Sequence, residues 1–179
     1  MMISTAIHAQ SQPKNYQVVT TAVPFLTLTP DSKSASMGDA GAASAPDANA
    51  MYWNTSKLAF IENKFGASFS YAPWLRDIVQ DMGLMSANGY YKVSDKQTIG
   101  ASITYFDQGD IQFTNTFGDN LEKFHSKEFS LALGIAQKLN SDFSMGLNLK
   151  FINSNLVGNT VINGQAGKPG RTGAIDLGF

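Results

Sequence analysis

The sequence predicts an all-β protein, an antiparallel sheet whose strands form part of a transmembrane outer-membrane β-barrel. Three observations lead to this class: strict alternation of apolar and polar residues in several segments, a second face made mostly of Gly, Ser and Ala, and connections that alternate between short and long. Alternation with a period of two is typical of strands that have two unlike faces. The length of 179 residues suits a single domain.

Six segments are expected to form the strands. Four alternate cleanly, at 65–72, 99–106, 129–136 and 143–151, a fifth at 83–91 is less regular, and a sixth begins at Thr172. In the segment 143–151, for example, Leu147 and Leu149 lie on the apolar face, whereas Gly146 and Asn148 lie on the other. The sheet therefore has one apolar face of large residues and one face of small residues.

Two environments produce such a sheet. A soluble sandwich turns its apolar face inward and its polar face to water, whereas a transmembrane barrel turns the apolar face to lipid. The small second face favours the barrel, because small side chains suit a crowded lumen. Aromatic residues near the strand ends, such as Phe143, Phe151 and Tyr105, fit the girdles of a barrel. Eight residues at about 40° tilt span roughly 20 Å, near the roughly 25 Å apolar band.

The connections add to this prediction. Short turns are expected at 93–96 and 140–142, and long loops at 107–127 and 153–171. Short turns face the periplasm and long loops the outside in bacterial barrels. Six strands are fewer than the eight of the smallest single-chain barrels, so the sequence is expected to be a truncated part of a longer barrel.

The N-terminal third divides into segments with different composition. Residues 1–9 end like a secretory signal but lack a basic start, and they are interpreted as the remnant of a signal peptide, which implies export. Residues 10–22 are expected to form a tail, residues 23–62 a separate segment rich in small residues, and residues 63–179 about six strands of the barrel.

Short helices are expected in the small-residue stretch before the strands. Thr29 is predicted to cap a first helix that ends at Gly38, a second follows Pro46, and a third runs from Thr55 to about Phe60. A phosphate-binding loop is excluded, because neither G-x-G-x-x-G nor G-x-x-x-x-G-K-[ST] occurs here.

Residues suited to catalysis are scarce. The chain has no Cys and only two His, and its net charge is −1, so thiol chemistry and nucleic-acid binding are not expected. Asp107, Asp110 and Asp119 lack the spacing of a calcium loop, and Asp39 and Asp47 are expected to cap backbone amides. The sequence therefore predicts a protein that is not an enzyme and holds neither metal nor cofactor.

The stretch "VPFLTLTPDSKSASMGDAGAASAPDANAMYWN" and the run "KLAF…FGASFSYAPWL" after it resemble the PorV family, outer-membrane proteins of the type IX secretion system of the Bacteroidota. The resemblance covers about Val23 to the end, although Thr55 stands where the family has Pro. It implies a FadL-like barrel of fourteen strands, about twice this length, in which residues 23–62 form an N-terminal plug or hatch inside the lumen. The hatch residues that carry the resemblance are Pro24, Met37, Gly38, Asp39, Gly41, Asp47, Trp53 and Asn54.

The resemblance also implies a function in protein transport. Such proteins lie in the lipid of the outer membrane, bind the C-terminal signal domain of secreted cargo, and shuttle it from the SprA/Sov translocon to the PorU attachment complex. A FadL-type channel for hydrophobic molecules and a soluble β-sandwich binding module are the alternatives.

The long loops 107–127 and 153–171 are the expected places of cargo contact, and the first stands out because it has a high apolar content for a loop. The candidate residues are Ile111, Phe113, Phe117, Leu121 and Phe124. Buried aromatic residues often carry most of the energy of an interface. The alternative interpretation is that these side chains only fold the loop onto the barrel rim.

Overall fold

A computed structural model describes residues 23–75, 81–114, 118, 120–156, 161–162, 165–166 and 168–179. Its helices are η1 (Pro24–Thr27), α1 (Ser32–Ser36), α2 (Ala50–Trp53) and η2 (Thr55–Phe60), where η marks a 3-10 helix. Its strands are β1 (Phe65–Pro73), β2 (Gly83–Ser94), β3 (Gln97–Thr114), β4 (Asn120–Lys138), β5 (Ser144–Asn155), β6 (Val161–Ile162), β7 (Gln165–Ala166) and β8 (Gly170–Gly178). Within these ranges, each helix is too short or too polar to cross a membrane.

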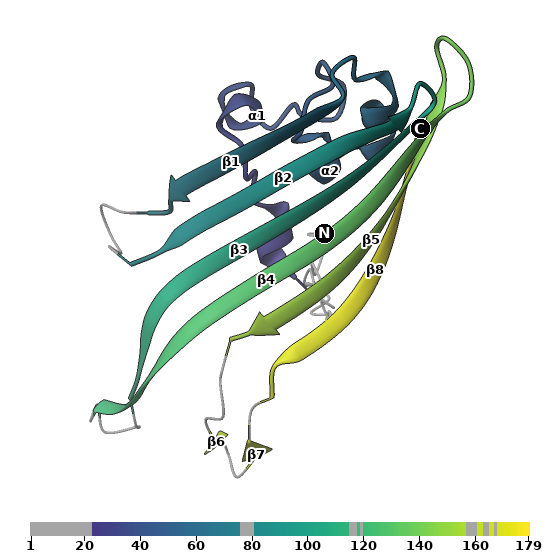
Figure 1. The fold of residues 1–179 in the computed structure, drawn as a ribbon. Coiled ribbons are helices and arrows are strands. Elements are labelled where there is room, and N and C mark those ends of the chain that lie inside the picture. The colour runs from purple at the N-terminus through teal and green to yellow at the C-terminus, as the bar shows by residue number, and fades with distance from the viewer. Residues whose placement is uncertain are drawn as a thin grey trace, which may run out of the picture.

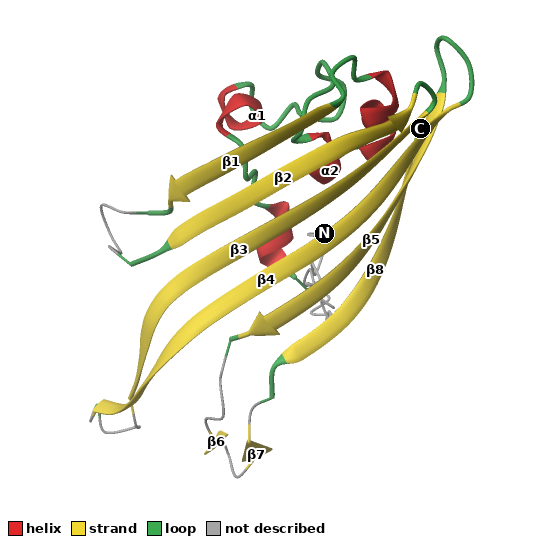
Figure 2. Ribbon diagram, in the orientation of Figure 1, coloured by secondary structure: helices red, strands yellow, loops and turns green. Residues whose placement is uncertain are grey.

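One antiparallel sheet dominates the fold (Figure 1). Its strand order is β1-β2-β3-β4-β5-β8, and β6 and β7 form a separate short pair. Each strand pairs with the strand next to it in the chain, apart from the β6–β7 excursion. All the helices lie on one side of the sheet (Figure 2). The predicted all-β antiparallel class is therefore confirmed.

The first of the two predicted long loops is much shorter than expected, and the second is slightly shorter. β3 continues to Thr114 and β4 begins at Asn120, so most of 107–127 is a paired extension of these two strands rather than a loop. The Asp and Gly residues that suggested a loop instead occupy a β-bulge between Asp107 and Asp110. Similarly, β5 continues to Asn155 and β8 begins at Gly170, which shortens the loop predicted at 153–171.

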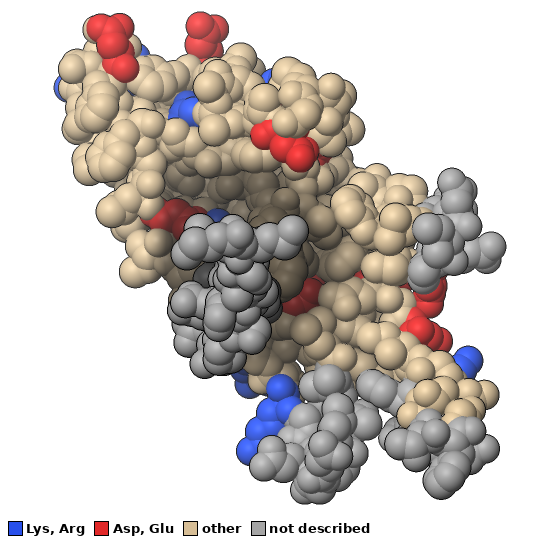
Figure 3. All heavy atoms as spheres, turned by 180° about the vertical axis from the view of Figure 1, so that it is seen from behind, with Lys and Arg blue, Asp and Glu red and all other residues tan. Residues whose placement is uncertain are grey.

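The two faces of the sheet differ as predicted. Residues at odd positions of β1–β5 form the outward face, and one cross-strand row consists of Phe69, Ala87, Ile103, Leu131 and Phe151. Leu133 in the next row is 67% exposed although it is a large apolar residue. The opposite face is covered by residues 23–62, which we call the hatch, and is hollowed beyond it (Figure 3). The apolar face is thus the uncovered one, unlike that of a soluble sandwich.

The outward apolar face is a band that ends in two rows containing aromatic residues, with charged residues beyond one of them. At one limit Phe65, Tyr91 and Ile99 lie side by side, and at the other Tyr71, Met85, Tyr105 and Phe129 do. The next outward pair beyond the second limit is Asp107 with Lys127. Ile99 and Tyr105 are six positions apart, or about 20 Å of strand at about 3.3 Å per residue and about 15 Å of height at about 40° tilt. The aromatic edges agree with those of an outer-membrane barrel, whereas the height between them is less than the roughly 25 Å apolar band of such a barrel.

The hatch helices begin at other residues than predicted. α1 is capped by Asp31 rather than Thr29, because the Asp31 carboxylate accepts a hydrogen bond from the Ser34 amide. The second helix starts at Ala50, several residues after Pro46. The third covers the predicted residues, but its cap is Asn54, whose side chain accepts from the Ser56 amide. Asp and Asn hold the helix starts because their short acceptors reach the free amides.

We predict that arginine on the outward face is costly in proportion to its depth in the band. Leu149→Arg, in the middle rows of β5, is expected to lower the free energy of unfolding by about 2–4 kcal/mol, whereas Asn153→Arg, at the rim of the same face, costs about 0–1 kcal/mol. The measurement is a refolding titration of the full-length protein in lipid vesicles. Equal costs at the two positions would contradict a lipid-facing band.

Candidate functional site

Three glycines of the central strands form a seat for the hatch. A Cβ atom at Gly100 would lie 2.4 Å from the Met51 sulfur, and one at Gly134 would lie 2.8 Å from the Thr55 methyl group. At Gly146 the obstacle is backbone, since a Cβ would lie 2.4 Å from the amide nitrogen of Ser56. α2 and η2 therefore lie directly on strand backbone, and a larger residue has no room there.

Apolar packing extends this seat. Met51, Leu58, Ala59 and Ile61 of the hatch form one buried cluster with Ala132 and Ala136 of β4. A second cluster joins Phe25 of η1 to Leu84, Phe106 and Ile152 of the sheet. The hatch is thus attached to the sheet at two places along its length, one through η1 and one through α2 and η2.

Polar contacts fix the register of the hatch against the sheet. On β5, the Ser144 hydroxyl donates to the Ser56 carbonyl at 2.9 Å, and the Asn148 amide donates to the Met51 carbonyl at 3.3 Å. On the other side, the Asn49 side-chain oxygen accepts from Ser68 of β1 at 2.6 Å and from Asn88 of β2 at 3.1 Å. These bonds satisfy hatch acceptors that the packing removes from water.

Asp31 ties separate parts of the hatch together. It is 2% exposed, and besides capping α1 it accepts a hydrogen bond from the indole nitrogen of Trp53 at 2.9 Å. The same indole ring lies against Gly41, where a Cβ would come within 2.1 Å of it. Asp31 is not among the residues singled out from the sequence, although the D-x-x-S spacing of a helix start is a signal that points to it.

Two titratable side chains of the hatch have shifted pKa values. Burial, followed by the charges of Asp39 and Asp31, raises the pKa of Tyr52 to about 12. Its hydroxyl therefore stays protonated and donates to the Leu26 carbonyl at 2.6 Å. Burial is also the main cause that lowers the pKa of Lys57, whose ammonium donates to the Gly41 carbonyl at 2.7 Å.

The predicted hatch residues divide into structural and exposed ones. Asp47 accepts from the Asn49 amide at 2.9 Å, as expected of a cap, and pairs with Lys33 at 2.8 Å. Asp39 instead accepts from the Thr29 hydroxyl at 2.5 Å. Gly38 has a φ of +68°, a conformation that favours glycine. Pro24 and Met37 are exposed.

The second candidate surface consists of residues 108–114 of β3 with 120–126 of β4, which we call the extension. It projects beyond the ends of the neighbouring strands (Figure 1). Ile111 and Phe124 are direct cross-strand partners, and both are half-buried. Phe113 lies on β3 and Leu121 on β4, with side chains outside the described part, and Phe117 lies outside the described residues altogether.

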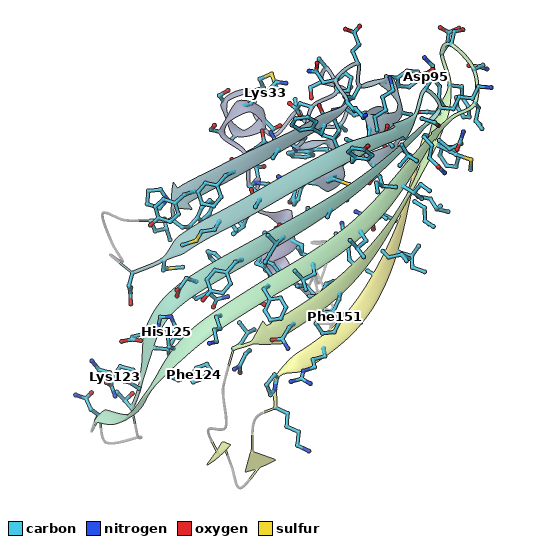
Figure 4. The ribbon with its side chains drawn as sticks, in the orientation of Figure 1. Lys33, Asp95, Lys123, Phe124, His125 and Phe151 are labelled. Atoms are coloured by element: carbon cyan, nitrogen blue, oxygen red, sulfur yellow. The ribbon has the colours of Figure 1, made fainter. Side chains whose placement is uncertain are left out.

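His125 joins the two strands of the extension on its outward side. Its Nε2 lies 2.9 Å from the Asp107 carboxylate, and its Nδ1 lies 2.9 Å from that of Asp110. Between the two Asp residues, Gly109 takes a φ of +72° in the bulge, and the Asp110 amide donates to Asp81 at 2.8 Å. Figure 4 shows His125 and Phe124 on the projecting part, far from Phe151 on the sheet.

Acidic side chains of the described ranges were candidates for a metal site. These ranges contain no group of three or more acidic or His side chains placed to hold a metal ion. The buried carboxylate of Glu128 has both oxygens occupied, by the Gln108 amide at 2.6 Å and the Ser154 hydroxyl at 2.5 Å.

We predict that filling the glycine seat displaces the hatch. Gly146→Ala places a methyl group against hatch backbone and is expected to lower the free energy of unfolding by about 1–3 kcal/mol. Gly173→Ala is the control, because its nearest non-neighbouring atom, the Lys150 carbonyl oxygen, is 3.7 Å from the new Cβ. Urea unfolding of both full-length variants in detergent measures this, and equal midpoints would refute the seat.

A second prediction concerns the protonation of His125. Hydrogen bonds to Asp110 and then Asp107 raise the pKa of His125 above 6.5. Because the folded-state pKa is the higher one, the contact stabilises the extension fully below about pH 6.5 and loses this effect as the pH rises through the raised value. A histidine NMR titration of the full-length protein should show the raised pKa, and Asp110→Asn should lower it. An unchanged pKa in Asp110→Asn would contradict the geometry.

The sequence is similar to that of one known protein family. No curated protein matches the sequence. The model of one family, described as type IX secretion system protein PorV, matches residues 10–178, which is nearly the whole chain. The match covers both the hatch and the six-stranded sheet. The chain therefore belongs to the PorV family of type IX secretion system proteins.

Proposed function

We propose that this chain is part of a non-enzymatic outer-membrane protein that holds secreted cargo by its C-terminal signal domain. In this proposal it receives the cargo from the SprA/Sov translocon and passes it to the PorU attachment complex. Family membership supports the link to type IX secretion. The apolar outward band with aromatic edges supports a position in the outer membrane.

The observation that carries the holding function is the extension of β3 and β4. It continues for about seven residues, or about 23 Å, beyond the charged pair that limits the apolar band. Apolar side chains persist there: Ile111 pairs with Phe124, while Asp110 pairs with His125 in the neighbouring position of the ladder. Because neighbouring ladder positions face opposite sides, the extension has one apolar and one charged side. An apolar side on a projecting hairpin is suited to contact with a folded partner.

The hatch also favours contact outside the lumen over passage through it. It is attached to the sheet by two buried clusters and by side chains from β1, β2 and β5. In a FadL-type channel for hydrophobic molecules, these contacts have to open for each transported molecule. We infer that residues 23–62 act as a fixed plug, that 63–179 form barrel wall, and that 1–9 and 10–22 are a signal remnant and a tail.

The extension provides the test of this proposal. Ile111→Ala combined with Phe124→Ala, in the full-length protein, is expected to weaken cargo binding by at least about 1.4 kcal/mol, or about tenfold. The affinity is measured with a purified C-terminal signal domain of a secreted protein. Leu139→Ala is the control, because Leu139 is a 52% exposed apolar residue outside the extension.

Stability and uptake measurements separate the alternatives. If the double variant keeps wild-type affinity for the cargo domain, the extension is not the contact surface. If the heat resistance of the double variant in detergent also falls, the two side chains are structural, as in the alternative interpretation that they only fold this region onto the barrel rim. Uptake of hydrophobic ligands into vesicles that contain the wild-type protein would favour the channel.

A further inference from the structure

The outward face of β1, β2 and β3 has a hollow in its middle rows. Four small residues form its floor: Ala67 is paired with Gly89, Gly89 with Ala101, and Ala87 lies in the next row. At every other outward position in these two rows of β1–β5 the residue is large and apolar, as with Phe69, Ile103 and Leu133. The hollow is therefore a local gap in an otherwise continuous apolar wall.

Large side chains make the hollow deep enough to receive a ligand. Phe69 and Ile103 border it on one side, Tyr91 and Ile99 on the other, and Leu133 stands beside it on β4. The hollow is part of an open groove of about 1500 Å³ that continues over β4 and β5 and whose surface is mostly apolar. The described part of the chain places nothing over it.

The width of the floor limits what fits. It spans three strands, or about 10 Å between the outer two at about 4.8 Å per strand spacing. An α-helix with its side chains is about 10–12 Å across, about as wide as the whole floor, so it would rest on the bordering side chains without reaching the floor. A single hydrocarbon chain is narrower and flexible. The position of the floor between the two aromatic limits places it at the depth of lipid acyl chains.

A positive charge lies at one end of the hollow. The Lys64 ammonium stands 6.0 Å from the centre of the Tyr91 ring, and Tyr91 lines the groove. Lys64 takes part in none of the ion pairs found in the described ranges. The adjoining turn region also carries Lys92 and Lys96, with Glu62 and Asp95 as the opposing charges. This end is thus suited to an anionic group, close to where an acyl chain would leave the hollow.

We propose that this hollow is a binding site for an anionic phospholipid, with one acyl chain on the small-residue floor and the phosphate at Lys64. The proposal rests on the proposed position in the outer membrane, and it is independent of the cargo contact at the extension. The aromatic row of Phe65 and Tyr91 lies where the headgroup meets the hydrocarbon. Aromatic rings are enriched at that depth in membrane proteins.

Lipid retention by the full-length protein tests the proposal. The protein is reconstituted in nanodiscs with equal amounts of phosphatidylglycerol and phosphatidylcholine, released into mild detergent, and weighed by native mass spectrometry. One adduct of phosphatidylglycerol is expected, favoured about fivefold over phosphatidylcholine, as one lysine at the membrane surface contributes about 1 kcal/mol. Gly89→Leu with Ala101→Leu fills the floor and should remove both adducts, whereas Lys64→Gln should remove only the preference.

Controls distinguish the possible failures. Ile135→Phe, on the same face but outside the groove, should leave the adduct unchanged. If the double variant does not fold, Ala101→Leu alone is used. Equal lipid retention by wild-type and filled variants would overturn the proposal, as would a co-purifying protein that is lost only when the floor is filled. Heat resistance in detergent reports whether the barrel is intact, and cargo binding should be the same in all of these variants.

Discussion

Close contact between the hatch and the strand backbone of β3, β4 and β5 is the constraint on which the rest of this structure depends. Gly100, Gly134 and Gly146 leave no side chain between the hatch and the sheet, so helical turns lie directly on the strands. A helix turn that packs this closely gains dispersion contacts along its length, and one extra methyl group removes them. The small second face of the sheet is thereby explained. It is small because another part of the same chain occupies the space, and the hatch in turn needs narrow residues such as Ala50 and Ala59.

The seat requires small residues on the inward face of the strands, whereas the band requires large apolar residues on the outward face of the same strands. With a period of two, each strand meets both demands by alternation, so that Gly134 touches the hatch while Leu133 and Ile135 face outward. A one-residue slip of register would exchange the faces and place large apolar side chains against the hatch. Polar anchors such as Ser144 and Asn148 bind hatch carbonyls at fixed positions and oppose that slip. The hatch therefore helps to specify the register of the sheet as well as filling the space beside it.

The strands and their faces could be predicted from the sequence because alternation is a local signal, and the segments around Phe69, Ile103 and Leu149 show it without ambiguity. The helix starts of the hatch were less predictable. Thr29, Asp31 and Ser32 are all competent caps, and the buried contact of Asp31 with Trp53, which no local pattern contains, selects among them. The extension was mistaken for a loop because Asp107, Gly109 and Asp110 have the composition of a turn. In the structure they form a bulge that His125 bridges from the partner strand, and such a contact across a hairpin is invisible to local patterns.

The bulge also explains how one hairpin serves two environments. Below it, β3 and β4 belong to the apolar band, and apart from Ala101 their outward residues from Ile99 and Ile135 up to Tyr105 and Phe129 are large and apolar. At the bulge one extra residue in β3 resets the alternation, and the strand gains local twist. Beyond it the outward side carries Asp110 and His125, while Ile111 and Phe124 occupy the opposite side of the ladder. The apolar side of the hairpin thus changes from outward to inward at the point where the band ends. A hairpin that simply continued the band would keep its apolar side outward, which in the proposed outer-membrane position would face water beyond the edge of the lipid. Because the apolar side is reversed, the extension presents its apolar surface on the same side of the sheet as the hatch. The proposed cargo domain would lie on this side, beyond the hatch.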